Sequence, residues 1–434
     1  MRKTARKTKD QEAGDGTVVS VLAQLVLPLA ELLRGDMREL VHTIGMQAIA
    51  TMLEQERTEL CGVRYRHSKD RRATRGGTTP GRLTLGGRTV RVRRPRVADR
   101  DGNGIPLETW QQLSAADPLS DRAYEQMVIG VSTRKYARSL EPLPGDLAEG
   151  ERSTSRSTVS RKFIAVGQAK LDEWLGRDLG DLDLVAVFID GLHFAEHVVL
   201  VALGVDAQGT KHILGLWEGA TENGPACRAL LSDIEQRGVK ADRTRLFVID
   251  GSKALRSAIR DVYGKRALVQ RCQVHKVRNV TSHLPKERHK HVRQVMRQAY
   301  KSRKPATAKK QLGNLARSLQ AKYPGAAASL REGLDETLTV MSLGLSPTLE
   351  RSFATTNPVE NFNGSARYLG RRVKRWRGGS MILRWVGAAV AEAEKGFRRL
   401  KGHRDMPSLV AALRKHDLKK RQSKELVDVR EDAA

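Results

Sequence analysis

Short apolar runs alternate with longer amphipathic stretches along the middle of the chain. Each run is short and rich in β-branched residues, which predicts a buried strand. The amphipathic stretches Pro225–Arg237 and Lys253–Tyr263 predict helices between the later runs. The predicted order is βββαβαβ, with strands at Leu184–Ile189, His197–Val205, His212–Trp217, Arg245–Ile249 and Ala267–Gln270.

The order βββαβαβ is that of a ribonuclease H-like α/β core, in which the first and fourth strands lie side by side. Asp190 and Asp250 each follow one of these two strands, and each precedes a glycine. Two carboxylates at the ends of neighbouring strands suit a divalent metal ion. For either site alone, the alternative is ordinary turn chemistry, because Asp-Gly pairs are common in turns.

The segments before this core predict helices and one β-hairpin. Helical spacing across 17–60 predicts two helices broken near Arg34–Asp36, suited to packing or dimerisation, after a disordered arm at Met1–Asp15. The stretch Arg82–Val92 alternates around a Gly-Gly pair, which predicts a hairpin.

Helical spacing continues up to the core. Leu119–Val131 and Arg134–Leu140 predict two helices, and a longer helix is expected to end near Leu175. Ser155 or Ser157 is suited to cap this longer helix. Hydroxyls and cations on its first turns suit the recognition helix of a helix-turn-helix-like DNA-binding region.

After the core, Val277 to about Ser346 predicts a helical insertion with no strand pattern. The next helix is capped by the stretch Ala354–Asn363 and carries Glu360 in its first turns. In the ribonuclease H-like fold, a helix after the sheet carries a third metal-facing carboxylate. Considered alone, Glu360 is more simply explained as a favourable charge near a helix start.

The chain is long enough for about two to four domains. We expect seven regions: an arm and helices with possible dimerisation at 1–60, a basic β-hairpin region at 61–118, a helix-turn-helix-like region at 119–177, the core in two parts at 178–276 and 351–405, a helical insertion at 277–350, and a tail at 406–434.

The charge distribution predicts a polyanionic partner. The net charge is +29, and 4% aromatic content favours a duplex backbone over single strands. Residues 276–323 hold 14 Lys/Arg and one acid, and 64–96 and 367–404 are similarly basic, whereas 178–262 hold 13 acids and 9 Lys/Arg. A mildly acidic core between basic segments suits an enzyme that binds a phosphate backbone with its basic segments and concentrates metal cations at its reaction centre.

Individual DNA contacts are expected on three basic elements. A solvated, charged hairpin is the alternative for the first of them. The candidates are Arg88, Arg91, Arg93 and Arg94 in the hairpin, Ser157, Thr158, Arg161 and Lys162 in the recognition helix, and Arg367, Arg371 and Arg372 after Glu360.

Neither a membrane segment nor a secretory leader is expected. The apolar stretch Val18–Leu33 is interrupted by Gln24, Pro28 and Glu31, and acids precede it. The three cysteines are widely spaced, with no Cys-x-x-Cys pair, which argues for a reducing compartment and against structural zinc. We therefore expect a cytoplasmic, nucleoid-associated protein.

Four motifs together resemble bacterial transposases of the mutator type, the insertion sequence 256 group. The resemblance covers most of the chain, from about Val18 to Leu400. Its most specific parts are Ile189–Gly191, Val248–Gly251, Gln270–Lys276 and Thr356–Asn363, and Arg372–Trp376 and Leu383–Trp385 also fit.

The resemblance implies a DDE triad of Asp190, Asp250 and Glu360. It also implies that Val277–Ser346 is a helical insertion and that 119–175 recognises terminal inverted repeats. The family carries a Cys/Asp-x-x-His motif beside the catalytic centre, so Cys272 and His275 are expected to form a structural or DNA-contacting element there. With no further Cys-His cluster in the sequence, they are not expected to bind zinc.

The expected function is that of a transposase that binds element ends and catalyses metal-dependent strand cleavage and strand transfer. The three carboxylates would hold two Mg²⁺ ions about 4 Å apart, with Mn²⁺ as a substitute. The expected partners are double-stranded DNA of the element ends and target, and a second copy in a homodimer, with no nucleotide cofactor. The alternatives are a structure-specific nuclease or resolvase of the same fold, and a transposase-derived DNA-binding regulator.

Overall fold

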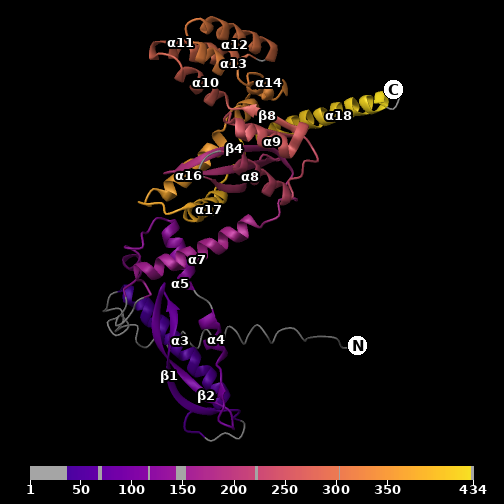
Figure 1. Cartoon of the computed structure of the whole chain (residues 1–434). Coiled ribbons are helices and arrows are strands. Elements are labelled where there is room, and N and C mark those ends of the chain that lie inside the picture. Colours follow the sequence, from indigo (N-terminus) through magenta and orange to yellow (C-terminus); the bar gives the residue numbers. More distant parts are fainter. Residues whose placement is uncertain are drawn as a thin grey trace. The chain divides into compact units, whose positions relative to one another are not determined.

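The computed structural model describes residues 37–66, 71–115, 118–142, 153–219, 223–302 and 304–431 (Figure 1). The chain divides into two compact units, Met1–Val166 and Gly167–Ala434, and each contains one β-sheet. The predicted arm at Met1–Asp15 and the first of the two predicted N-terminal helices lie outside the described residues.

The first unit contains a helix packed on a three-stranded sheet. Its elements are α3 (Met37–Cys61), β1 (Thr74–Leu85), β2 (Arg88–Ala98), β3 (Gly104–Ile105), α4 (Glu108–Ala115), α5 (Pro118–Val128), the 3-10 turn η1 (Ala137–Ser139) and the beginning of α7 (Arg156–Leu175). Leu53 of α3 and Val90 of β2 belong to the shared core. The predicted hairpin is confirmed, and Gly86 and Gly87 form its turn with φ of 59° and 80°, a region that favours glycine.

The predicted helix Arg134–Leu140 is wrong. This segment is a turn followed by the single 3-10 turn η1. Tyr136 is fully buried, and its hydroxyl donates a hydrogen bond to the carbonyl oxygen of Gly87 at 3.1 Å. So short a stretch gains little from helix formation alone, and its tertiary contact with the hairpin turn determines its shape.

The second unit is built on a five-stranded mixed sheet of order β6-β5-β4-β7-β8. β4 pairs antiparallel with β5 and parallel with β7, so the first and fourth strands of this unit are neighbours, as predicted. The elements of this part are β4 (Leu184–Phe194), β5 (His197–Asp206), β6 (Lys211–Gly219), α8 (Gly224–Gln236), β7 (Arg245–Ile249), α9 (Lys253–Tyr263) and β8 (Ala267–Arg271).

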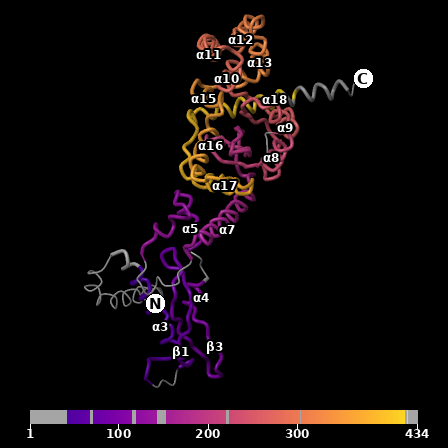
Figure 2. The backbone as a smooth tube through the Cα atoms, turned by 60° about the vertical axis from the view of Figure 1, so that its left-hand side comes forward, coloured from indigo at the N-terminus to yellow at the C-terminus, as the bar shows by residue number. Residues whose placement is uncertain are grey.

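Helices cover both faces of this sheet (Figures 1 and 2). Along β4, Val187 and Ile189 belong to the core shared with α8 and α9. Phe188 and Leu192 belong to the core on the other face, because side chains alternate along a strand. That second face is covered by α15 (Pro347–Phe353), α16 (Asn357–Gly370), α17 (Gly379–Lys395) and the first turns of α18 (Met406–Glu431).

The predicted end of β4 at Ile189 is wrong. β4 continues through Asp190 and Gly191 to Phe194, and its ladder with β5 includes Asp190 opposite Val201. The strand is longer than its apolar run because a tight turn joins it directly to β5, which fixes the register of the whole antiparallel pair.

A helical bundle extends the β8 edge of the sheet, as predicted for the insertion. Its helices are α10 (Gln273–Ser282), α11 (Lys286–Lys301), α12 (Pro305–Gln320), α13 (Pro324–Arg331) and α14 (Thr339–Ser342). Leucine and alanine side chains fill its core, and the described residues of 273–353 form no strand. Buried Gln270 of β8 ties the bundle to the sheet: its Nε2 donates to the Thr337 carbonyl at 3.0 Å, and its Oε1 accepts from the Val340 amide at 2.8 Å. Within the described ranges, we find no helix with the length and apolar character needed to span a membrane.

Candidate active site

The register of the sheet places Asp190 and Asp250 beside each other. Ile189 and Ile249 are partners in the parallel pair of β4 and β7, and each acid is the next residue. Neighbouring strands lie about 4.8 Å apart, so the backbones of the two acids are adjacent. Asp190 alternates with Ile189, and its side chain therefore points to the sheet face covered by α16.

The two Asp-Gly pairs have different backbones. Asp190 remains in the ladder, whereas Gly251 has a φ of 119° and turns the chain away from the sheet. The Asp250 carboxylate accepts a hydrogen bond from the Ser252 amide at 2.8 Å, as in an Asx-turn. Of the two Asp-Gly pairs, the one at Asp250 therefore forms a turn, as the alternative explanation expected. The second carboxylate oxygen of Asp250 stays available for other partners.

Helix α16 brings two polar side chains to the same edge. Glu360 lies in its first turn, and Asn363 follows three residues later on the same helix face. Asn363 is 1% exposed, and its Nδ2 donates a hydrogen bond to Asp190 Oδ2 at 2.8 Å. Its Oδ1 is buried and has no hydrogen-bond partner among the described residues. One turn of helix thus connects Glu360 with the immediate surroundings of Asp190.

Electrostatic interactions link the three acids. Burial, and then the negative charge of Asp250, raise the pKa of the Asp190 carboxyl to about 6. The charge of Glu360 adds to this increase in pKa, and His275 opposes it. The structure therefore brings the two strand acids and the helix acid to one edge of the sheet, where they repel one another.

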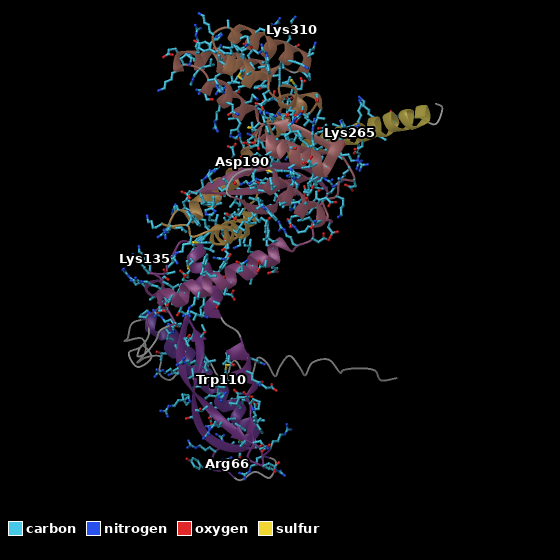
Figure 3. All side chains as sticks on the ribbon, in the orientation of Figure 1. Arg66, Trp110, Lys135, Asp190, Lys265 and Lys310 are labelled. Atoms are coloured by element: carbon cyan, nitrogen blue, oxygen red, sulfur yellow. The ribbon has the colours of Figure 1, made fainter. Side chains whose placement is uncertain are left out.

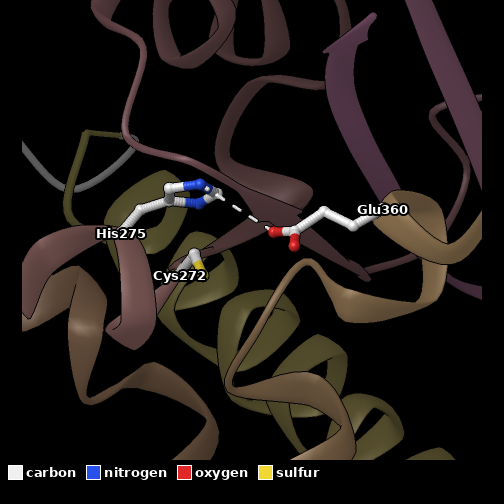
Figure 4. A group of neighbouring side chains, drawn as sticks. All are labelled: Cys272, His275 and Glu360. Atoms are coloured by element: carbon white, nitrogen blue, oxygen red, sulfur yellow. Dashed lines mark ion pairs between the residues drawn. The ribbon is translucent and has the colours of Figure 1, made fainter. Parts of the chain in front are cut away.

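Cys272 and His275 lie next to Glu360 (Figure 4). Cys272 is buried between β8 and α10. Its amide donates a hydrogen bond at 2.7 Å to the carbonyl of Ile249, the residue before Asp250. His275 Nε2 lies 3.8 Å from Glu360 Oε1, and the Thr356 hydroxyl donates to the same Glu360 oxygen at 2.6 Å. The Cys272 backbone thus contacts the end of β7, and the His275 side chain lies beside the first turn of α16.

The cysteine and the histidine form a coupled pair. The hydrogen bond with Cys272 raises the pKa of His275 to about 9, against the effect of burial. Burial by itself would raise the pKa of the Cys272 thiol, but hydrogen bonds with His275 and Thr356 hold it below its ordinary value. A protonated His275 places a positive charge beside Glu360 and so reduces the repulsion among the acids.

Among the described residues, one group of potential metal ligands has its donor atoms close together, and it includes Glu360 but neither Asp190 nor Asp250. The Glu360 carboxylate, Cys272 Sγ and one His275 nitrogen all lie within 4.8 Å of one another, a geometry that could hold a thiophilic metal ion. Asp190 and Asp250 would add only oxygen atoms to the Glu360 carboxylate. Oxygen ligands suit Mg²⁺ and Mn²⁺, whereas thiolate and imidazole suit zinc.

The sequence candidates for DNA contacts in the first unit have different surroundings. Arg88 donates to the backbone carbonyls of Ala137 and Glu141, and the guanidinium of Arg94 lies 5.3 Å from the centre of the Trp110 ring. Lys162 donates to the Ser120 hydroxyl at 3.0 Å, and Thr158 accepts from Ser155. The remaining four side chains are exposed: Arg91, Arg93, Ser157 and Arg161.

In the second unit, exposed cations lie on α16 and on α11. Arg367, Arg371 and Arg372 are exposed at the C-terminal end of α16, with Arg371 stacked on Tyr368 at 3.6 Å from the ring centre. The sequence reasoning missed a row on α11, spaced so that its members share one helix face. This row, the α11 stripe, comprises Lys286, Lys290, Arg293, Arg297 and Lys301, all exposed around one groove. Figure 3 shows Asp190 in the sheet and Lys310 in the bundle that contains α11.

Sequence reasoning also missed Asn363 and Thr356 as members of the acidic site. Both lie within the motif Thr356–Asn363, in which only Glu360 was predicted to be a functional residue. The available signal was the position of Asn363 between Phe362 and Ala366 on the buried face of α16. A polar side chain on an apolar helix face needs a partner, and here the partner is Asp190.

Comparison with known proteins assigns the chain to a family. The family described as Transposase, Mutator family matches residues 20–399. The chain belongs to this family. Membership of the family implies that the protein cleaves and transfers DNA strands.

Individual relatives agree with this assignment. The chain is 26% identical to the transposase for insertion sequence element IS256 in transposon Tn4001 of Staphylococcus aureus, over 79% of this chain and 86% of that protein. It is 27% identical to the ISRM5 transposase of Rhizobium meliloti, over 86% and 91% of the two chains. It is also 27% identical to the IS1081 transposase of Mycobacterium tuberculosis, over 84% and 87%.

Proposed function

We propose that this Mutator-family transposase cleaves and transfers DNA strands at a metal site formed by Asp190, Asp250 and Glu360, in a core of the ribonuclease H-like class. The observation that carries the proposal is the convergence of three acids from β4, β7 and α16, one of them held by Asn363. The βββαβαβ order and the adjacency of β4 and β7 support the assignment of the core to this class.

The residues present fit Mg²⁺. The three acids offer only oxygen donors. Burial, and then the charges of Asp250 and Glu360, raise the pKa of Asp190, and a bound cation would offset both effects. The buried Asn363 Oδ1 without a partner adds an uncharged oxygen nearby. Bound Mg²⁺ would neutralise charge on a phosphodiester and make a water or a DNA 3′-hydroxyl a better nucleophile.

The surrounding residues orient these acids. Asn363 donates to Asp190 and leaves its other carboxylate oxygen available. Thr356 donates to Glu360 from the preceding turn, and His275 places a positive charge on the same side. Fixed hydrogen bonds to ligating carboxylates hold them in position before substrate arrives, so that binding costs less reorganisation.

Exposed cations outside the acidic site position duplex DNA. The α11 stripe and the exposed arginines of α16 and β2 neutralise backbone phosphates, which gives affinity without reading sequence. The α7 segment with Ser157 and Arg161 remains our candidate for recognition of terminal inverted repeats. Two element ends must be brought together, so we also propose that the active form contains at least two copies of the chain.

Incubation with the DNA ends of the element tests this function. A labelled duplex that spans the junction between element and flank should be nicked in Mg²⁺ or Mn²⁺ and left intact in EDTA. Asp190→Asn, Asp250→Asn and Glu360→Gln should each abolish nicking and strand transfer, because each removes one charged oxygen donor.

DNA binding should persist in all three variants, since the cationic surfaces are unchanged. Wild-type cleavage by any one of them would show that the triad is wrongly assigned. Cutting of branched DNA without regard to the terminal sequence would favour a structure-specific nuclease. Tight binding in EDTA without nicking in any metal would instead favour a regulator.

A further inference from the structure

A cationic cleft adjoins the helix that carries Glu360. It has a volume of about 480 Å³ and lies between β6, α15, the first turns of α16 and the segment that leads to α18. Four of its lining residues are cations and two are side-chain amides: Lys211, Arg351, Arg399, Lys401, Asn357 and Asn361. None of the described residues that line it is an acid, although Glu360 lies on the same helix as Asn357 and Asn361.

The cations of this cleft have no carboxylate partner among the described residues. Lys211 is the least exposed of the four, and its Nζ lies 5.0 Å from the centre of the Phe397 ring. Burial lowers the pKa of Lys211, which shows that its ammonium group has lost part of its hydration. A partly desolvated cation without a counter-ion gains most from an anionic ligand.

The cleft lies next to the acidic site along α16. Asn361 directly follows Glu360, and Asn357 precedes it by three residues, so both lie within about one helical turn of it. Successive phosphates of one DNA strand follow at about 3.4 Å of helix rise. A strand that continues from the acids along α16 would bring neighbouring phosphates to these amides and to the cations behind them.

We propose that this cleft binds the backbone phosphates immediately next to the scissile phosphate and thereby fixes the position of the cleaved strand. The inference rests on the proposed function of the acids. Four cations and two amides, with no acid, match a phosphodiester backbone in charge and in hydrogen-bonding capacity. Cations supply attraction, and the amides flanking Glu360 set the register between the strand and the acids.

The test combines protein variants with DNA that lacks single charges. Element-end duplexes carry one neutral methylphosphonate at a time, at successive positions around the scissile phosphate. Their binding by the full chain is measured in EDTA, so that cleavage plays no part. For the wild type, one or two positions next to the scissile phosphate should each weaken binding by about threefold to tenfold.

Arg399→Gln combined with Lys401→Gln should weaken binding of unmodified DNA and abolish the further loss at those one or two positions. The matched control is Arg293→Gln combined with Arg297→Gln on the α11 stripe, which removes the same charge. This control should keep the full sensitivity at the same positions. Lys211→Met, which retains the apolar stem beside Phe397, provides a second cleft variant.

The proposal fails if the loss of binding caused by a methylphosphonate simply adds to the loss caused by the protein change. In that case each methylphosphonate weakens both cleft variants as much as the wild type, and the cleft does not hold those phosphates. Equal sensitivity at positions far from the scissile phosphate would also refute it. Because binding in EDTA does not depend on metal chemistry, these outcomes are distinguishable from a failure of the triad. That failure would appear as cleavage by Asp190→Asn or Glu360→Gln.

Discussion

The acidic edge of the sheet and the α11 stripe are opposite in almost every physical respect. Asp190 is largely buried, accepts a hydrogen bond from Asn363 and is influenced by two other acids. The cations of the α11 stripe are exposed, and no carboxylate of the described residues pairs with them. Both regions belong to the same unit, and the insertion that carries the stripe is tied to β8 by Gln270.

The difference separates two demands that DNA chemistry makes on a protein. Reaction at one phosphodiester needs a few groups fixed in place, and burial with paired hydrogen bonds provides that rigidity. Attraction of a long duplex needs many weak contacts that tolerate any sequence, and exposed cations provide them. Perturbing the first region should change rates at constant affinity, and perturbing the second should change affinity at a constant rate of cleavage by the bound enzyme.

Among changes that leave the three acids intact, the largest effect is expected from Asn363→Leu. This change removes the donor to Asp190 Oδ2 while nearly preserving side-chain volume, so the carboxylate loses its fixed orientation. We expect the cleavage rate of bound DNA to fall about 10- to 100-fold and the Mg²⁺ concentration for half-maximal rate to rise. Single-turnover cleavage across a Mg²⁺ titration measures both.

Ser365→Ala is the matched control for this prediction, because Ser365 is exposed on the same helix and, among the described residues, its hydroxyl donates only to the Asn361 carbonyl. It should cleave like the wild type. A wild-type rate and Mg²⁺ dependence for Asn363→Leu would mean that the hydrogen bond to Asp190 has no role in positioning.

A smaller effect concerns pH. The raised pKa of Asp190, about 6 without metal, means that a proton occupies this carboxyl below that pH and must leave before a cation binds. The apparent affinity for Mn²⁺ or Mg²⁺ should therefore fall as pH decreases through 6, by up to about tenfold per pH unit. Calorimetric titration of metal into the DNA-free protein measures this dependence.

Glu360→Gln sharpens the same prediction. It removes one of the charges that raise the pKa of Asp190, so the decline in metal affinity should begin at a lower pH than in the wild type. An unchanged midpoint in this variant, or metal affinity independent of pH around 6, would contradict the electrostatic account of the site.

Much of this arrangement follows from local patterns in the sequence. The apolar runs predicted every strand of the larger sheet and their order along the chain, because a strand buried on both faces needs such a run. Asp190 and Asp250 are candidates because they follow two of these strands, whereas Glu360 joins them only through the family resemblance, and their joint role stays a prediction.

Features that depend on tertiary contacts were not predicted. The continuation of β4 to Phe194 depends on its pairing with β5, and the loss of the helix at Arg134–Leu140 depends on Tyr136 reaching Gly87. Asn363 could not be assigned to Asp190, because a partner that lies 173 positions away is visible only in the fold. The cleft beside α16 joins four segments and has no local signature at all.

The smallest effect is expected on the α11 stripe. Each lost phosphate contact lowers the slope of log affinity against log salt by about 0.9, so Arg293→Gln with Arg297→Gln should lower it by about two. Filter-binding or fluorescence anisotropy over a range of salt concentrations measures the slope. The rate of cleavage by the fully bound enzyme should not change.

Lys309→Gln is the control for the stripe, since Lys309 lies in the same bundle but already pairs with Asp335 at 2.8 Å. Its slope should stay at the wild-type value. An unaltered slope in the double variant would show that the stripe does not contact DNA.

The unequal backbones of the two neighbouring aspartates have a consequence for successive reactions at one centre. The backbone of Asp190 is part of the hydrogen-bonded pairing of β4 with β5, which continues to Phe194. Asp190 therefore cannot move without disturbing the sheet. Asp250 is the first residue after β7, and Glu360 lies in the first turn of α16. In the reaction we propose, a DNA hydroxyl takes the place of water as the attacking group, and we expect Asp250 and Glu360 to move to accommodate it while Asp190 stays fixed.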